Sequence, residues 1–384
     1  MARYFKNFNY LMFFAMVALI AIGTVSIWSA GNARSEAVFH GMWKQTLSTA
    51  LFGLVVYFVL SALDYRRLLD FGSVAAYGTA LVLLVAVLAF GSEIYGGKRW
   101  LWFFQPSEIS KLCIIMFLAD YGRKLRDFGF WGFMLTGLIV GVPLLLILAE
   151  PDLGTALTLV PAVLMMMFAL RIWRKGLLVI LAIMALGGSA IMGAVYEAEK
   201  PGVAAETRAA ILKWVPLKPH QVKRVKVFLF PEEDILGAGY NLRQAKISIG
   251  SGGFSGKGIG KGETNHLKYL PQAISMNDFI FCVYAEETGF VGSLALLALF
   301  GMLVIPGAWT AFTSNDERGE ALALGVSVLV FAHVYINIAM SIGLVPITGL
   351  PLPFISSGRT FLLTVMAALG MVQSVATHRE ATRQ

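Results

Sequence analysis

Apolar runs of the length that a bilayer requires recur along almost the whole chain. A helix needs roughly 20 predominantly apolar residues to cross the hydrocarbon core of a membrane. Of the 384 residues, 57% are hydrophobic and only 14% are charged, whereas about a quarter are charged in a typical soluble domain. The sequence therefore predicts an all-α integral membrane protein with about ten transmembrane helices, at residues 10–29, 45–63, 72–91, 107–121, 130–149, 153–171, 176–196, 277–306, 319–343 and 359–377.

One long polar segment interrupts these runs. Residues 197–276 separate the seventh run from the eighth, and the rest of the chain shows no repeat of fixed period and no low-complexity tail. We therefore expect a single polytopic membrane domain over residues 1–384, with 197–276 as a large extracytoplasmic loop between helices 7 and 8. The first run is not expected to be a cleaved signal peptide, because it is long and no small-residue cleavage site follows it.

Lys and Arg residues predict the orientation of the helices. If both ends are cytoplasmic, most of the Lys and Arg residues of the short connections fall on the inner side, as the positive-inside rule requires. The long loop is exempt from that rule and carries most of the net charge of +8. This local basic charge suits either an anionic substrate or ordinary anionic phospholipid, and it does not indicate nucleic-acid binding.

The long loop has internal order. Residues 207–214 and 220–230 mix basic and apolar side chains, which predicts short helices at the membrane surface. Residues 241–249 predict another helix, and 250–263 are too rich in glycine for regular structure. That segment lacks the strand and the Lys-Ser/Thr ending of a nucleotide-binding phosphate loop. Its amides and lysines suit a lipid pyrophosphate better.

Charged residues inside apolar runs are costly in a membrane and indicate function by default. Glu108 and Lys111 are three residues apart, so they lie on one helical face and can form a pair. This pair is either a mutually neutralising structural element or part of a polar cavity where Lys111 or Arg99 meets a phosphate. The sequence alone leaves both interpretations open.

Further carboxylates mark two more helix boundaries. Glu150 and Asp152 flank a proline, and Asp152 is well placed to cap the helix that follows. Asp278 falls in the first turn of the eighth run, where the helix dipole favours a negative charge. Glu286 lies about two turns further on nearly the same face, and Glu287 is displaced by about 100°. If the helix begins near the outer surface, both glutamates lie about three turns into the membrane, where each requires a polar partner or a proton. We expect Glu286 to pair with a basic residue across the bundle.

The two cysteines, Cys113 and Cys282, both lie in apolar runs. Their spacing fits neither a metal site nor a disulfide framework. We therefore expect two free thiols in the core, and the sequence predicts no metal-ligand set.

A series of motifs occurs in a fixed order along nearly the whole chain. They are QPSEISK, EPDLGTA, GAGYN followed by Gln244, GSGG, GKG, the YLP–DFIF–EETG–VG series and NIAMSIGLVPITGLPLPFISSG. Together they resemble the SEDS family, the RodA, FtsW and SpoVE proteins of bacterial wall synthesis. The stretch FLFPEEDILGAGYN is most similar to the RodA, or elongation, branch.

The resemblance implies an enzyme, a peptidoglycan glycosyltransferase. Such an enzyme polymerises Lipid II on the outer face of the bacterial cytoplasmic (inner) membrane and releases undecaprenyl pyrophosphate, here in cell elongation and rod-shape maintenance. An α-linked donor gives a β-linked glycan, so the reaction inverts the sugar and needs one carboxylate base. The resemblance makes Asp278 that base. It implies as substrate-binding residues Arg99, Glu108, Lys111, Gln244, Lys257 and Lys261, and as supporting residues Asp152, Glu286 and Ser356.

The resemblance also implies partners. A class B penicillin-binding protein would supply the crosslinking reaction beside this chain in the lipid bilayer. Carboxylates near a diphosphate are consistent with Mg²⁺ or Mn²⁺. Two other functions stay open, a lipid-linked precursor transporter (a flippase) and a noncatalytic cell-wall scaffold.

Overall fold

The chain folds into a bundle of long helices that coincide with the apolar runs. The computed structural model describes residues 2–32, 37–94, 97–102, 104–150, 152–200, 202–234, 237–263, 271 and 275–379. The long helices are α2 (Tyr10–Asn32), α4 (Met42–Ala62), α5 (Tyr65–Phe90), α6 (Pro106–Arg126), α7 (Gly129–Ala149), α8 (Leu153–Ala169), α9 (Arg174–Glu199), α15 (Ile280–Phe312), α16 (Glu317–Ile342) and α17 (Arg359–His378).

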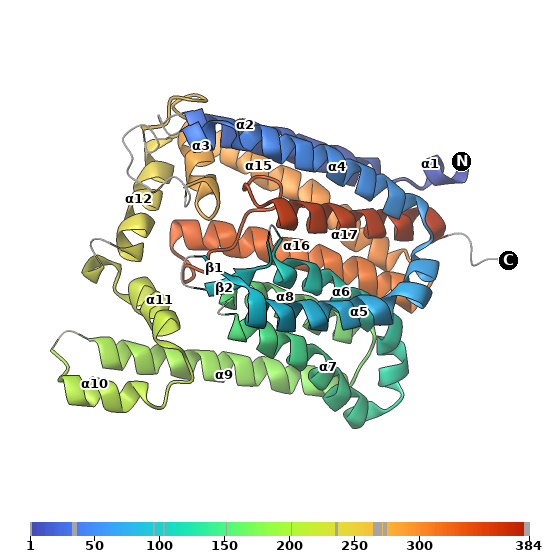
Figure 1. The fold of residues 1–384 in the computed structure, drawn as a ribbon, viewed down its shortest axis with the longest axis horizontal. Helices are drawn as coiled ribbons and strands as arrows, with labels where there is room; N and C mark the ends of the chain where they lie inside the picture. The colour runs from blue at the N-terminus through green and yellow to red at the C-terminus, as the bar shows by residue number, and fades with distance from the viewer. Residues whose placement is uncertain are drawn as a thin grey trace.

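The shorter elements lie at the ends of the bundle (Figure 1). They are α1 (Ala2–Lys6), α3 (Ala37–His40), α10 (Ala205–Leu212), α11 (Pro219–Leu229), the 3-10 helix η1 (Pro231–Glu233), α12 (Ala238–Ser251) and an antiparallel pair of strands, β1 (Ser92–Ile94) and β2 (Gly97–Trp100). The helices α10 to α12 confirm the order predicted within the long loop. They lie at one end of the bundle, here called the loop end. The opposite end, here called the termini end, holds α1 and the end of α17.

Eight helices of the described residues are long and apolar enough to cross a membrane. The helix α8 is apolar but shorter, and α6 is not among the eight because it carries buried charged residues along its length. The predicted fold class, a multi-pass all-α membrane protein, is therefore confirmed, but the count of ten spans is not.

Burial separates the centre of the bundle from its edge. In α17 and α16, 83% and 72% of the apolar window is buried, against 6% in α9. Figure 1 shows α9 at the edge, with α10 and α11 beside its end. An apolar helix that the rest of the chain leaves uncovered presents its side chains to lipid.

The helix α15 is broken at one residue. Gly289 has φ 68° and ψ −163°, a combination that only glycine adopts without strain. A Cβ at this position would lie 2.3 Å from the backbone nitrogen of Gly256. The run at 277–306 is thus two helical pieces that meet where the glycine-rich segment of the long loop approaches.

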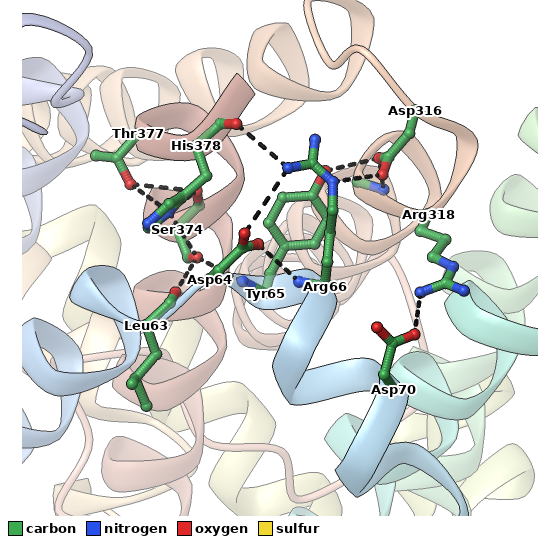
Figure 2. A network of polar contacts seen from close by, with 11 residues as sticks. Leu63, Asp64, Tyr65, Arg66, Asp70, Asp316, Arg318, Ser374, Thr377 and His378 are labelled. Carbon is green, nitrogen blue, oxygen red and sulfur yellow. Dashed lines mark hydrogen bonds and ion pairs between the residues drawn. The ribbon is translucent and has the colours of Figure 1, made fainter. Parts of the chain in front are cut away.

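A network of polar contacts connects helices at the termini end, as Figure 2 shows. Asp316 caps α16 by accepting a hydrogen bond from the Gly319 amide at 2.8 Å, and it also accepts from Tyr65 Oη at 2.7 Å and Arg66 Nε at 3.0 Å. Arg66 in turn donates to the carbonyl of His378 at 3.4 Å. The starts of α5 and α16 and the end of α17 are therefore joined by one carboxylate and one guanidinium group.

The next two residues of α16 extend this network. Glu317 pairs with Arg126 of α6 at 2.6 Å. Arg318 lies 2.6 Å from Asp70 of α5 and 3.3 Å from Asp120 of α6. The first turn of α16 thus links two other helices, α5 and α6, at the termini end.

We expect Asp316→Asn to lower the stability of the protein by about 1–3 kcal/mol, because it weakens a helix cap and two hydrogen bonds, one to a charged group. Burial raises the pKa of Asp316, but hydrogen bonds from Tyr65, Gly319 and Arg66 outweigh burial and hold it below its ordinary value. This contribution is therefore present above the unfolded pKa and lost as pH falls through the folded pKa. Melting curves in detergent at neutral and acidic pH test this. The control, Asp127→Asn, removes a carboxylate that is 76% exposed. Equal melting of both variants would contradict the prediction.

Candidate active site

Asp278 lies at the loop end, two residues before α15 begins. Its side chain is partly buried, and its main-chain oxygen accepts a hydrogen bond from Asn337 Nδ2 at 3.0 Å. The same Asn337 amide donates to the Leu350 carbonyl at 2.6 Å. A side chain of α16 therefore ties the Asp278 segment to the loop that precedes α17.

Ser356 fixes the same segment from the other side. Its Oγ donates to the Asn277 carbonyl at 2.6 Å and accepts from the Leu352 amide at 2.8 Å. The neighbouring Ser357 donates to the Asn277 side chain. Ser356 thus lies where a supporting residue is expected, one peptide unit away from Asp278.

Gly349 brings backbone close to the Asp278 carboxyl group. It has φ +73°, and a Cβ placed there would lie 3.4 Å from Asp278 Oδ2. A side chain at this position would meet both a strained backbone and the carboxylate. The turn at Gly349 therefore packs directly against the Asp278 carboxyl group.

Two guanidinium groups from other parts of the chain act electrostatically on Asp278. Arg224 comes from α11 and donates to the Thr348 carbonyl at 2.9 Å, and Arg99 comes from β2 and donates to the Glu150 carbonyl at 3.2 Å. Burial raises the pKa of Asp278 to about 6, and the positive charges of Arg224 and Arg99 oppose that rise. The site therefore holds a carboxylate that is a usable base near neutral pH, with two cations beside it.

Arg224 is a site residue that the sequence did not single out. It lies among several basic residues of a segment that predicted only a surface helix. Burial lowers its pKa, Arg99 lowers it further, and Asp278 and Asp152 raise it. What distinguishes Arg224 from its basic neighbours is its tertiary contact, the hydrogen bond to the Thr348 carbonyl, which the sequence does not show.

Asp152 confirms its prediction as a helix cap. It accepts from the Thr155 amide at 3.2 Å and from Thr155 Oγ1 at 2.8 Å. Gln105 Nε2 and Ser107 Oγ donate to the same carboxylate at 2.9 and 3.2 Å. Asp152 thus joins the starts of α8 and α6.

The neighbouring Glu150 is fully buried. Neither of its carboxyl oxygens has a hydrogen-bond partner among the described residues. Burial and the nearby charge of Asp152 raise the pKa of Glu150, and Arg99 opposes them, so that the pKa is about 9. Glu150 is therefore a neutral carboxyl group at pH 7, so it does not compete with a phosphate for Arg99.

Glu108 and Lys111 form the predicted pair, with 2.8 Å between Lys111 Nζ and Glu108 Oε2. Lys111 is 1% exposed, and its Nζ also lies 2.8 Å from Nε2 of His333. His333 is one turn from Asn337 on α16, so the pair lies about one turn, roughly 5–6 Å, deeper than the backbone of Asp278. The sequence did not predict the contact between His333 and Lys111, because His333 is an isolated polar residue in an apolar run.

Glu286 and Glu287 bind the glycine-rich segment. Glu286 Oε1 lies 2.9 Å from Lys257 Nζ and accepts from the Glu263 amide at 2.9 Å. Glu287 Oε1 accepts from the Gly260 amide at 3.2 Å and from Ser29. The expected basic partner of Glu286 is thus a loop lysine, and the ammonium group of Lys257 is engaged by α15.

The backbone of this segment caps both pieces of the broken helix. The Lys257 and Gly258 amides donate to the Glu286 and Glu287 carbonyls at 3.0 and 2.9 Å. On the other side of Gly289, the Phe290 amide donates to the Gly253 carbonyl at 2.9 Å. The segment is irregular, as predicted, but its backbone hydrogen bonds fix it against α15 on both sides of Gly289.

Two other predicted substrate-binding residues lie on α12 and on the glycine-rich segment. Gln244 is partly buried on α12, and Lys261 is exposed on the glycine-rich segment. Among the contacts of the described residues, none joins either side chain to Asp278. Their roles, like those of the other site residues, stay predictions.

A family model for FtsW, RodA and SpoVE, described as cell cycle proteins, matches residues 9–381. The chain belongs to this family. Peptidoglycan glycosyltransferase MrdB of Escherichia coli is 34% identical over 380 residues, which cover 96% of this chain and 93% of the relative. Peptidoglycan glycosyltransferase RodA of Treponema pallidum is 30% identical over 426 residues, which cover 96% and 98%.

Two solved structures of the family's fold are similar over nearly their whole length. The rod shape determining protein RodA of Thermus thermophilus has a TM-score of 0.67 and 26% identity, covering 97% of this chain and 98% of that chain. A chain of a peptidoglycan synthase complex, from work on the structural coordination of polymerization and crosslinking, has a TM-score of 0.76 and 28% identity with the same coverage. The predicted membership of the FtsW, RodA and SpoVE family is confirmed.

The described residues do not meet the requirements of a metal site. Within the part of the chain that the structure describes, no group of three or more His, Cys, Asp or Glu residues is placed to hold a metal ion. Cys113 and Cys282 are both buried free thiols.

Proposed function

We propose that this protein is a peptidoglycan glycosyltransferase, an inverting hexosyltransferase that polymerises Lipid II into glycan strands and releases undecaprenyl pyrophosphate. One observation carries the proposal: a partly buried carboxylate, Asp278, lies at the loop end, where Arg224 and Arg99, held on the Thr348 and Glu150 carbonyls, act on it electrostatically. Relatives named for this activity, which match nearly the whole chain, support it.

The proposed chemistry needs one base. The hydroxyl group of the acceptor sugar attacks the anomeric carbon of the lipid-linked donor, and its proton passes to the Asp278 carboxylate. A new glycosidic bond forms as the bond between the anomeric carbon and the pyrophosphate oxygen breaks. Attack opposite the leaving group inverts the sugar.

The leaving group needs positive charge. The pyrophosphate takes the electron pair of the broken bond, and Arg99 and Arg224 are the cations on the Asp278 side of the site. Guanidinium groups suit phosphate because they donate two hydrogen bonds in a fixed geometry. Preorganised positive charge in a site with little water stabilises the negative charge that develops there.

We further propose that the loop end faces outward from the bacterial cytoplasmic membrane and that both termini lie in the cytoplasm. The Lys and Arg residues of the short connections support this orientation. We also propose a class B penicillin-binding protein as the crosslinking partner, supported by the similarity to a chain of a peptidoglycan synthase complex. The RodA-like stretch near residue 230 supports a role in elongation.

A divalent cation is proposed only as part of the substrate. Because the described residues offer no metal cluster, Mg²⁺ or Mn²⁺ would enter as a counterion of the pyrophosphate. No step above depends on it.

The transporter alternative receives less support. A transporter alternates access between the two sides of the membrane. Ion pairs of Asp316, Glu317 and Arg318 join the three helices α5, α6 and α16 at the termini end, and the Asp278 site is at the other end.

A reconstitution tests the proposed function. The purified protein, with and without a class B partner, receives labelled Lipid II and divalent metal, and the products are separated on a gel. We expect glycan chains. No chains, together with Lipid II translocation in vesicles, would replace the proposal with the transporter, and neither activity would favour the scaffold.

The pKa of Asp278 predicts the pH dependence. The polymerisation rate should rise with pH through a midpoint near 6, because the base must be deprotonated, and then level off. Arg224→Met should move the midpoint to higher pH, because it removes a positive charge that opposes the raised pKa. Rates measured over about pH 5–8 check this. The control Arg243→Met changes an exposed arginine of α12 and should leave the midpoint in place. An unmoved midpoint in Arg224→Met would contradict the assignment.

A further inference from the structure

A cavity of about 490 Å³ lies at the loop end within the long loop. The end of α9 and the helices α10, α11 and η1 form it, and its lining includes none of Asp278, Arg99 and Arg224. Its volume is in the range of about 300–1,000 Å³ that small-molecule sites occupy. We propose that this cavity binds the peptide portion of the lipid-linked disaccharide peptide. The inference rests on the proposed function and adds a specificity site to it.

One helix connects the cavity to the candidate active site. On α11, the positive charge of Arg99 lowers the pKa of both His220 and Arg224. The negative charge of Asp278 raises the pKa of Arg224. The adjacent Lys223 lines the cavity. Successive residues are about 100° apart around a helix, so the cavity and the active site lie on neighbouring sides of α11.

The distance between the two sites suits a short peptide. A helix with its side chains is about 10–12 Å wide. A peptide of about five residues spans about 17 Å when extended. A peptide attached to a sugar at Asp278 is therefore longer than the width of α11, the helix that the two sites share.

Part of the cavity lining is an ion-pair cluster around the buried carboxylate of Glu199. Glu199, at the end of α9, is 5% exposed and lies 2.5 Å from Arg208 Nη2 and 2.8 Å from Lys226 Nζ. Lys226 Nζ also lies 3.0 Å from Glu233. These pairs link α9, α10, α11 and η1 around the cavity.

The remaining lining defines the chemistry of the ligand. Apolar side chains such as Val222 and Leu217 form part of the wall, and acidic and basic residues occur in equal numbers. Lys223 is exposed, and no ion pair engages it among the described residues. A peptide with carboxylate, amide and ammonium groups complements this mixed surface. A pyrophosphate, which carries only negative charge, does not need the acidic residues.

A segment of a partner protein is the competing occupant. The shared helix α11 favours the substrate peptide, because a ligand in the cavity is then covalently linked to the reacting sugar. The two occupants differ in one respect that an experiment can separate: the peptide acts without a partner protein.

The test compares two substrates, the lipid-linked disaccharide with its full peptide and the same molecule after enzymatic removal of the peptide. The wild type should have a KM about tenfold lower for the peptide-bearing substrate, as expected for one charged contact. Lys223→Glu should raise that KM about tenfold and leave kcat and the KM for the peptide-free substrate unchanged. The control Lys213→Glu makes the same charge change on an exposed residue outside the lining and should behave like the wild type.

A second variant keeps the test independent of charge. Leu217→Trp fills the cavity and should remove the same preference for the peptide-bearing substrate. Equal KM values for both substrates in the wild type, or an equal rise for both in Lys223→Glu, would overturn the inference. An effect of Lys223→Glu that appears only with the class B partner would assign the cavity to that partner and overturn it too. No polymer from either substrate would instead overturn the proposed function, and the inference with it.

Discussion

Asp278→Asn should abolish polymerisation of Lipid II while leaving the protein folded. The substitution keeps the size of the side chain but removes the group that accepts the proton from the attacking hydroxyl. General-base catalysis contributes about 10²–10⁴-fold to a rate, so the residual rate should fall by at least about a hundredfold. Gel analysis of glycan chains from purified proteins measures this loss.

The stability of the same variant provides its control. The folded pKa of Asp278, about 6, lies above the ordinary value of 3.8 for this side chain. The carboxyl group therefore favours the folded state most at low pH, and this contribution is lost as pH rises through the folded pKa. The neutral amide avoids that loss, so Asp278→Asn should melt no lower than the wild type at pH 7. Full activity in a well-folded variant would contradict the base assignment, and a much lower melting temperature would point to a structural role.

Lys111→Ala should destabilise the protein strongly. Lys111 is 1% exposed and lies 2.8 Å from Glu108, which is 3% exposed. Removing one partner of a buried ion pair leaves the other charge without compensation, which costs about 3–5 kcal/mol. A melting curve should show this loss, and activity should fall with it. Wild-type melting and full activity would show that neither proposed role of Lys111 is right.

A double variant separates the two roles of this pair. Glu108→Gln combined with Lys111→Met removes both charges and keeps similar volumes, which is often close to neutral for stability. If the pair is only structural, this variant should recover melting and polymerisation together. Recovered melting without polymerisation would show that Lys111 or Glu108 acts on the substrate, and its readout would be a raised KM.

Features that depend on local patterns could be predicted from the sequence. The apolar runs predict the long helices because the bilayer sets their length. Asp152 caps α8 because the capping position follows directly from where the apolar run starts. Glu108 and Lys111 pair because residues three apart share a helical face.

Features that depend on packing between distant segments could not be predicted. Arg224 faces Asp278 only because α11 folds back over the helix ends, and His333 reaches Lys111 only because α16 packs against α6. The break of α15 at Gly289 depends on the glycine-rich segment that caps it. That segment has the composition of a flexible loop, and its order comes from Glu286 and Glu287, which are distant in sequence.

The count of spans shows the same limit. Length and hydropathy identify eight helices, whereas α6 is buried among other helices and carries charges that pair inside the bundle. Composition alone cannot distinguish a charged helix that crosses the membrane within a bundle from one that does not.

The most direct test of the central claim is the stoichiometry of the reaction in vesicles that contain only this protein, its class B partner and labelled Lipid II. Glycosidic bonds formed and undecaprenyl pyrophosphate released are counted for the wild type and for Asp278→Asn. We predict equal amounts of both products from the wild type and neither from the variant. Equal product from both proteins, or none from the wild type, would contradict the claim that Asp278 is the base of a polymerase built by this chain.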